Sequence, residues 1–330
     1  MFSVCFLLSV SFSLAQQKKQ NVYFLKNDNR QVAHRDDADF IRVIQEPDSG
    51  ETNFVVHEYH KNGEKKTIGK VSAFEPFLVF EGAVITYFDN GSREGIVNYE
   101  NGKPSGSAYF YFRNGKMEKQ FDYLLTDKAD KKPSGLKTMQ ALNEPKGKLI
   151  FFADSLGKVL VKDGNGRAIE ISGKADDELV EEGDYLNGLK NGTWFGSYRS
   201  GKSSYEESYD AGKFLSGKSV KDSVSYPYTT LSTPPKYKTD VNEFYKYVGK
   251  SIRYPKDAIA NRISGSVALS FVIDKDGKLT DILILSPLFP SLDDMARRVL
   301  NDSPKWQPGI QRGLPVRVKY NFPIKFSLGR

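Results

Sequence analysis

The sequence predicts a mainly β protein, an antiparallel β-hairpin array, followed by a small α+β domain with a three-stranded sheet and flanking helices. Three features predict this fold. Asn-Gly and related turns recur through the first part of the chain, the segments between them alternate in polarity, and helical periodicity gives way to two-residue periodicity near the end. With 330 residues, 39% of them hydrophobic, the chain is long enough for two or three folded domains.

The array is predicted from a repeat of two turns. The glycines of these turns lie 11 and 13 residues apart in a first set and 13 and 11 apart in a second, at Gly91, Gly102, Gly115, Gly188, Gly201 and Gly212. Asn-Gly permits positive φ at both central positions of a hairpin turn. A tyrosine precedes most of the turns, as Tyr111 and Tyr198 do. Each unit is therefore predicted to be a β-hairpin whose aromatic face is covered by its neighbours. The pattern resembles MORN-like repeats.

Composition divides the chain into four parts. Residues 16–222 form the predicted repeat region, interrupted near 126–147 by a stretch rich in Lys, Asp and Pro that predicts an exposed loop. Residues 223–238 hold prolines among Ser, Thr and Tyr and predict a short, fairly extended linker. Residues 239–330 form a C-terminal domain, and residues 1–15 are predicted to be a signal peptide.

The signal peptide is predicted from an uncharged stretch, Phe2 to Ala15, with small residues at Ser13 and Ala15 before a polar segment. It is shorter than the roughly 20 residues that span a bilayer as a helix; the alternative interpretation is a buried helix. Cys5 is the only cysteine, so a cleaved protein would lack disulfides, a thiol nucleophile and cysteine-ligated metal. We expect export to the periplasm. Because no Lys or Arg precedes the apolar run, a start farther upstream, with inner-membrane association, stays open.

The net positive charge of the chain lies in the C-terminal domain. From Pro234 onward there are 17 Lys+Arg and 9 Asp+Glu, whereas the rest of the chain has 31 and 32. Basic domains often bind nucleic acid or anionic surfaces. Export argues against nucleic acid, which leaves acidic protein segments or envelope polymers as expected partners.

Helical periodicity opens the C-terminal domain. Asp240 is expected to cap a helix that carries Val241, Phe244 and Val248 on one face and ends at Gly249. A second short helix is expected after Pro255. A later helix, with the apolar stripe Leu292–Leu300, is expected to be capped by Ser291 and to end before Pro304.

Strand periodicity follows in three places. Residues 267–273 and 279–286 alternate and flank the turn Asp274–Gly277, which predicts a hairpin. In a third strand, apolar and polar side chains alternate through Val316, Arg317, Val318, Lys319, Tyr320, Asn321 and Phe322. Pro323 has no N–H group to donate, which suggests that this strand lies at an edge or carries a bulge.

Five short motifs occur in order over roughly residues 234–330. They are Tyr254-Pro255, Gly265-Ser266-Val267, Ile273-Asp274-Lys275-Asp276-Gly277, Pro304-Lys305-Trp306-Gln307-Pro308-Gly309 and Pro315-Val316-Arg317-Val318. Together they resemble the TonB C-terminal domain, and the hairpin array before it resembles a form common in the Bacteroidetes group. The sequence departs from that pattern at Leu288-Phe289-Pro290, where a Gly-rich stretch is usual, and it shows no long anchor helix or proline-rich spacer.

The resemblance implies a partner-binding edge strand at Val316–Phe322, which would accept an extended segment of an outer-membrane TonB-dependent transporter. Arg317 and Lys319 would attract an acidic or polar peptide; alternatively they form a solvated face that discourages aggregation. The remaining motif residues are expected to pack rather than to contact a partner: Tyr254, Pro255, Gly265, Pro304, Trp306 and Pro308.

No constellation of residues supports catalysis, and no cofactor or metal is expected. His57 and His60 are one residue short of the zincin spacing. Two functional hypotheses remain. The first is a TonB-like protein in energy-dependent transmembrane transport, which would also need inner-membrane motor proteins. The second is a non-transducing periplasmic adaptor whose repeats bind protein or an envelope polymer. Cleavage after Ala15 would favour the adaptor. The sequence leaves a dimer open.

Overall fold

The computed structural model describes residues 19–124, 137–138, 146–173, 178–201, 203–238 and 241–328. The predicted signal peptide and the expected cap Asp240 lie outside the described residues, as does most of the stretch 126–147 that was predicted to be a loop.

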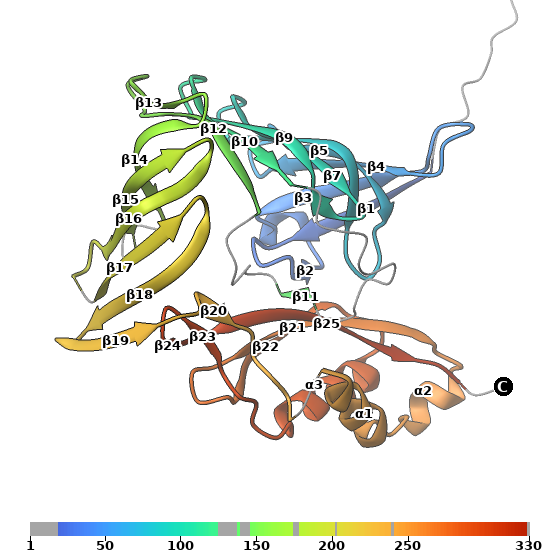
Figure 1. Ribbon diagram of the computed structural model, residues 1–330. Helices are drawn as coiled ribbons and strands as arrows, with labels where there is room; N and C mark the ends of the chain where they lie inside the picture. The colour runs from blue at the N-terminus through green and yellow to red at the C-terminus, as the bar shows by residue number, and fades with distance from the viewer. Residues whose placement is uncertain are drawn as a thin grey trace, which may run out of the picture.

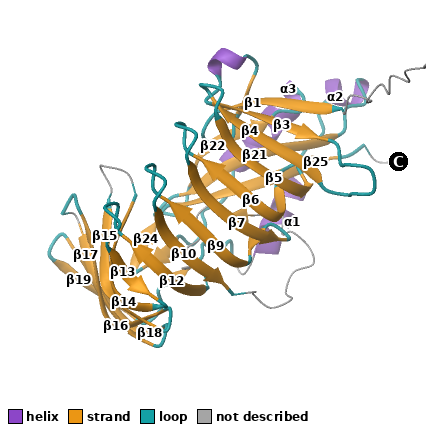
Figure 2. Cartoon of the chain, turned by 90° about the horizontal axis from the view of Figure 1, so that it is seen from above, coloured by secondary structure: helices purple, strands orange, loops and turns teal. Residues whose placement is uncertain are grey.

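The first part of the chain is a single antiparallel sheet of 18 strands, and most strands pair with their neighbours along the chain. A short 3-10 helix, Arg35–Asp37, lies between β2 and β3. The strands are β1 (Gln20–Leu25), β2 (Gln31–Val32), β3 (Phe40–Gln45), β4 (Phe54–His60), β5 (Lys65–Ala73), β6 (Val79–Tyr87), β7 (Arg93–Glu100), β8 (Lys103–Pro104), β9 (Gly106–Tyr111), β10 (Met117–Tyr123), β12 (Gly147–Ala153), β13 (Val159–Lys162), β14 (Asn165–Ser172), β15 (Leu179–Leu186), β16 (Leu189–Tyr198), β17 (Ser203–Asp210), β18 (Lys213–Lys221) and β19 (Val224–Tyr228). Figure 2 shows this sheet as a long row of hairpins. The predicted hairpin array is confirmed, although the family name of its repeats is not tested.

Two kinds of turn join the hairpins. At Asn101-Gly102 and Asn187-Gly188 both central residues have positive φ, as the sequence predicts. At Asn62, Asn90 and Asn114 only the glycine that follows has positive φ, so the expectation of two positive φ values is wrong there.

In this second kind of turn the asparagine side chain links successive hairpins. The Asn62 Nδ2 donates to the Asp89 carbonyl at 2.7 Å, and the Nδ2 groups of Asn90 and Asn114 donate to the carbonyls of Arg113 and Ser155, each at 3.2 Å. Each asparagine Oδ1 also accepts the backbone N–H two residues later in its own turn. These asparagines therefore stack turn upon turn along one rim of the array.

Aromatic rings of the second half of the array lie against glycines of the preceding strand. Gly196 pairs with Tyr205 and Gly217 pairs with Tyr228 across neighbouring strands. A Cβ atom at either glycine would overlap the ring of its partner. Glycine is needed at these two positions because the backbone itself forms the surface on which the ring packs.

The C-terminal domain combines two small sheets with three helices. In the larger sheet β21 (Gly265–Ile273) lies between β22 (Leu279–Ser286) and β25 (Val318–Phe326), and β11 (Lys137–Thr138) adds to the outer edge of β25. The smaller sheet holds β20 (Ser232–Thr233), β23 (Gly309–Gln311) and β24 (Leu314–Val316). The helices are α1 (Val241–Ser251), α2 (Lys256–Ala260) and α3 (Pro290–Asn301). The predicted strand hairpin and helix order are confirmed.

Several expected boundaries are wrong. α1 continues through Gly249 to Ser251 rather than ending there, and α3 begins at Pro290 with Phe289 as its cap instead of Ser291. The expected third strand is split, because Val316 ends β24 and β25 runs from Val318 to Phe326 with Pro323 inside it. The residues expected to form an extended linker contain β19 and β20.

The helices cover one face of the larger sheet, and the array arches over the other (Figure 1). On the helix side, the buried core gathers Phe244, Phe271, Leu292, Trp306 and Phe322. β21 is buried on both faces: Ala268 and Ser270, which lie on the side away from this core, are 1% and 0% exposed. The sheet therefore lies between its helices and the rest of the chain.

Candidate functional site

β25 has one fully paired edge and one nearly open edge. It pairs with β21 along its whole length, from Val318 opposite Ile273 to Phe326 opposite Gly265. On its outer edge, within the described part of the chain, the strand β11 pairs with only Tyr320 and Asn321 of its nine residues. No described residue pairs with the rest of this edge, and an unpaired strand edge can accept an added strand.

β11 occupies part of the strand edge at which the sequence predicts a bound partner segment. Lys137 lies opposite Asn321, and Thr138 lies opposite Tyr320, in antiparallel register. A guest strand over the middle of β25 must displace this pair of residues. No other described strand pairs with the outer edge of β25 on either side of these two residues.

The predicted partner-binding residues divide between the two sides of the strand. Val318, Tyr320 and Phe322 are buried in the helix-side core, so they support the strand and do not face a guest. Lys319 and Asn321 alternate with them on the array side, and Asn321 lines a cleft there. Val316 belongs to β24 and lies outside the open edge.

Arg317 is held within its own domain. Its Nη2 donates to the Asp281 carboxylate at 2.5 Å, and its Nε lies 3.6 Å from Asp274. Lys319 makes no ion pair within the described residues. Of the two cations that were expected to attract a peptide, only Lys319 has a charge that no described carboxylate neutralises.

The structure gives the surroundings of several family-motif residues. Trp306 is 4% exposed and lies against Phe244, with ring centroids 4.9 Å apart. Tyr254 donates its hydroxyl to the Ile263 carbonyl, and Pro255 precedes α2. Gly265 begins β21. Pro304 and Pro308 flank Trp306 between α3 and β23.

Sequence reasoning missed the contact that joins the two parts of the protein. Arg312 lies at the tip of the β23–β24 hairpin, where it and Gly313 both have positive φ. Its Nε donates to Glu207 Oε1 at 2.7 Å, and its Nη2 donates to Glu181 Oε1 at 3.2 Å. Its guanidinium carbon lies 3.8 Å from the centre of the Tyr205 ring. We call Arg312, Glu207, Glu181 and Tyr205 the latch.

The latch is buried and its acceptors are satisfied. The Glu207 side chain is 0% exposed and the Arg312 side chain 15%. The hydroxyls of Tyr228 and Tyr209 also donate to Glu207, at 2.7 and 2.9 Å. The three donors satisfy the hydrogen-bonding capacity that burial would otherwise leave unmet.

The pKa shifts of the latch agree with its geometry. Burial alone would lower the pKa of the Arg312 guanidinium, but Tyr205, Glu207 and Glu181 outweigh it and raise that pKa. Burial alone would raise the pKa of Glu181, but Lys190, Tyr205 and Arg312 hold it below its ordinary value. Burial raises the pKa of the Tyr205 hydroxyl, and the nearby Glu181 adds to this. Both groups of the Arg312–Glu181 pair are therefore charged at neutral pH.

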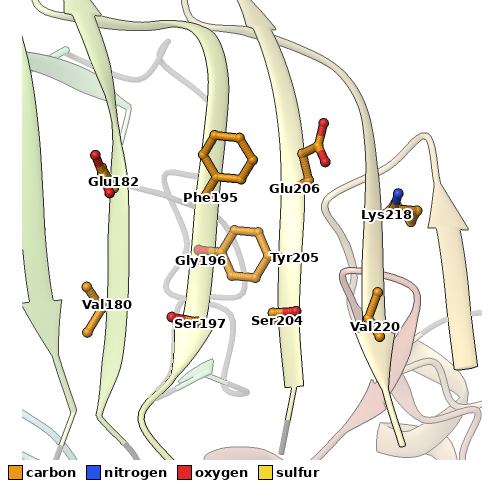
Figure 3. Close-up of a pocket in the computed structure, with 10 residues that line it drawn as sticks. All are labelled: Val180, Glu182, Phe195, Gly196, Ser197, Ser204, Tyr205, Glu206, Lys218 and Val220. Carbon is orange, nitrogen blue, oxygen red and sulfur yellow. The ribbon is translucent and has the colours of Figure 1, made fainter. Parts of the chain in front are cut away.

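A shallow hollow of about 340 Å³ lies over β15 to β18. Figure 3 shows Glu182, Phe195, Glu206 and Lys218 side by side on the four strands, and they are cross-strand neighbours in that order. Glu182 is already paired with Arg167 at 2.9 Å. The hollow offers a half-exposed aromatic ring between two carboxylates and no arrangement typical of a catalytic centre.

Known proteins resemble the C-terminal domain, which holds the open edge of β25. Residues 250–328 match the family of Gram-negative bacterial TonB protein C-terminal domains. This family is associated with transport and acts in the periplasm. We call the matched region the TonB-like domain.

One solved structure matches part of the chain, the solution structure of the TonB C-terminal domain of Helicobacter pylori. It is 26% identical, and the match covers 27% of this chain and 81% of that domain, with a TM-score of 0.23. No curated protein matches the chain. Within the described residues, no helix is both long and apolar enough to cross a membrane.

Proposed function

We propose that the TonB-like domain binds an extended segment of an outer-membrane transporter by strand addition at the outer edge of β25, as part of TonB-like energy-coupled transport. The observation that carries this proposal is the pairing of β25. Its inner edge is fully paired with β21, whereas its outer edge meets only β11 in the described part of the chain. The family match supplies the transport context.

Backbone hydrogen bonds give such a site affinity that depends little on the guest sequence, and alternate side chains of the guest select it. Lys319 projects from the array side of β25 without a described counter-charge, which favours an acidic guest residue beside it. Arg317 contributes little to the charge seen by a guest, because Asp281 and Asp274 already neutralise it.

The two residues of β11 make guest binding competitive. A guest that pairs with Tyr320 and Asn321 replaces Thr138 and Lys137. Replacing residues 126–145 by a short Gly-Ser linker is therefore expected to strengthen guest binding, because the guest no longer competes with the chain itself.

The test is photo-crosslinking in cells of the native organism. A photoreactive amino acid at position 319 is expected to capture an outer-membrane transporter, and more of it when residues 126–145 are replaced. The same amino acid at Lys250, an exposed position on α1, is the matched control and should capture none. Capture of soluble proteins alone from position 319 would refute the transport proposal and leave the adaptor hypothesis.

A further inference from the structure

The cleft that Asn321 lines lies between the array and the TonB-like domain. It encloses about 870 Å³, and the array side contributes apolar residues that include Leu25, Ile44 and Phe80. The domain side contributes the end of β22, with Leu285, and the loop residue Leu288. Ligand sites are common at such junctions between domains and often have this size.

The polar groups of the cleft are mostly neutral. Asn29, Gln31 and Asn321 supply side-chain amides, and Ser266 and Ser286 supply hydroxyls. An amide side chain presents a donor beside an acceptor, which matches the peptide group of an extended chain.

Among the described residues, two charged side chains line the cleft, Arg42 and Glu75. Arg42 is paired with the buried carboxylate of Glu58 at 2.7 Å and also donates to Asn29 at 3.0 Å. The positive charge of Arg42 is therefore neutralised within the array. Glu75 accepts a hydrogen bond from the Tyr23 hydroxyl at 3.4 Å, and no described cation pairs with it, so the cleft disfavours an acidic ligand.

Two buried oxygens on this side of the sheet lack a hydrogen-bond partner within the described residues. They are Asn321 Oδ1 and Ser270 Oγ, and the two residues lie directly opposite each other on β25 and β21. Such a group costs free energy unless a donor reaches it. Asn321 lines the cleft, so a ligand N–H can supply that donor.

The edge of β22 completes the site. β22 is the last strand of its sheet in the described part of the chain, and its residues Leu285 and Ser286 line the cleft. A strand edge binds an extended peptide through main-chain hydrogen bonds, while neighbouring apolar residues accept its side chains. This edge lies across the sheet from the outer edge of β25.

We propose that the cleft is a second peptide-binding site, which takes an extended peptide that carries an apolar side chain and no acidic one. The side chain packs between Phe80 and Leu285, and the peptide backbone bonds to Asn321 and to the edge of β22. This site is separate from the transporter-binding edge of β25 and binds a different ligand.

The experiment begins with a displayed library of random 12-residue peptides selected on the intact chain. The enriched peptide, labelled with fluorescein, is titrated by fluorescence anisotropy. Ser266→Tyr fills the cleft from an exposed position, and Ser204→Tyr makes the same change at an exposed position of β17. We expect Ser266→Tyr to weaken peptide binding by about tenfold or more, because the peptide loses a hydrogen bond and an apolar contact. Ser204→Tyr should leave peptide binding unchanged.

Asn321→Leu provides a second readout that does not depend on filling the cleft. It is expected to raise the midpoint of thermal unfolding of the free protein, because a buried oxygen without a partner is removed. It is also expected to weaken the binding of the peptide. Equal binding to the Ser266→Tyr variant and the wild type would overturn the proposal. So would a library that yields no peptide while chitohexaose, a neutral sugar probe, binds in the cleft. Transporter capture from position 319 should persist in Ser266→Tyr, so failure of this site and failure of the β25 edge are distinguishable.

Discussion

Removing the Arg312 side chain should release the TonB-like domain from the array. In Arg312→Met, the Glu207 carboxylate stays buried and loses its only charged partner among the described contacts, a 2.7 Å hydrogen bond from Arg312 Nε. The hydroxyls of Tyr209 and Tyr228 remain as donors. The cation over the Tyr205 ring and the contact with Glu181 are lost as well.

The size of the effect follows from this geometry. Breaking a buried ion pair by removing one partner costs about 3–5 kcal/mol. Because two hydroxyl donors still serve Glu207, we expect the lower end, about 3 kcal/mol, or roughly a hundredfold shift toward the undocked arrangement. Two hydrogen bonds to the backbone of Arg312 do not depend on its side chain. The Ser219 hydroxyl donates to the Arg312 carbonyl, and the Arg312 N–H donates to the Leu231 carbonyl. They limit the loss to the side-chain contacts.

Two experiments measure this shift. The first is hydrogen exchange of residues 309–316, and the second is urea unfolding, followed by one signal from the array and one from the TonB-like domain. Arg312→Met should accelerate exchange in the hairpin and separate the two unfolding transitions. Arg167→Met removes an exposed cation paired with Glu182 and Asp184 and should change little. The double variant Arg312→Met/Glu207→Gln should recover part of the loss, because no buried charge is left unpaired. Identical exchange and unfolding in Arg312→Met and Arg167→Met would show that the latch does not hold the domains together.

Three further predictions concern the array. Gly196→Ala places a methyl group inside the Tyr205 ring and should lower the free energy of unfolding by about 1–3 kcal/mol; Ser197→Ala, one residue on, is the control, and equal urea midpoints would contradict the packing argument. Burial works against ionisation of Glu58, but Arg42, Lys66 and Thr67 outweigh it and hold its pKa below the ordinary value. Its contribution to stability is therefore complete above about pH 4.3, the pKa of an unfolded glutamate, and is lost as the pH falls toward the folded pKa. Glu58→Gln should destabilise the protein at neutral pH and flatten the acid side of its pH–stability curve; Glu206→Gln, the same change at an exposed position of β17, is the matched control. Asn62→Asp keeps the acceptor for the Glu64 N–H but loses the donor to Asp89, and should cost about 0.5–1.5 kcal/mol; a thermal melt as high as that of the wild type would exclude a stabilising role for the asparagine contacts between turns.

The hairpin array could be predicted from the sequence because its signals are local. An Asn-Gly pair selects a tight turn, and alternation sets which side chains share a face. The order of helices and strands in the TonB-like domain follows from similar local patterns. The boundaries of the elements were harder to predict, because the residue at which a strand or helix ends depends on the segments that pack beside it. Val316 and Val318 continue one alternating pattern, yet β24 and β25 pair with different strands.

The site shows the same division. The sequence by itself determined that the residues around Tyr320 form a strand with one face buried and the other polar. Only the tertiary structure decided that β11 pairs with that strand, that Arg317 is neutralised by Asp281, and that Arg312 reaches Glu207 more than a hundred residues away. A local clue to the latch existed, because Glu207 occupies an inward position between Tyr205 and Tyr209, where a charge requires a partner. The identity of that partner was not a local property, because contacts between distant segments depend on how the two folded parts pack against each other.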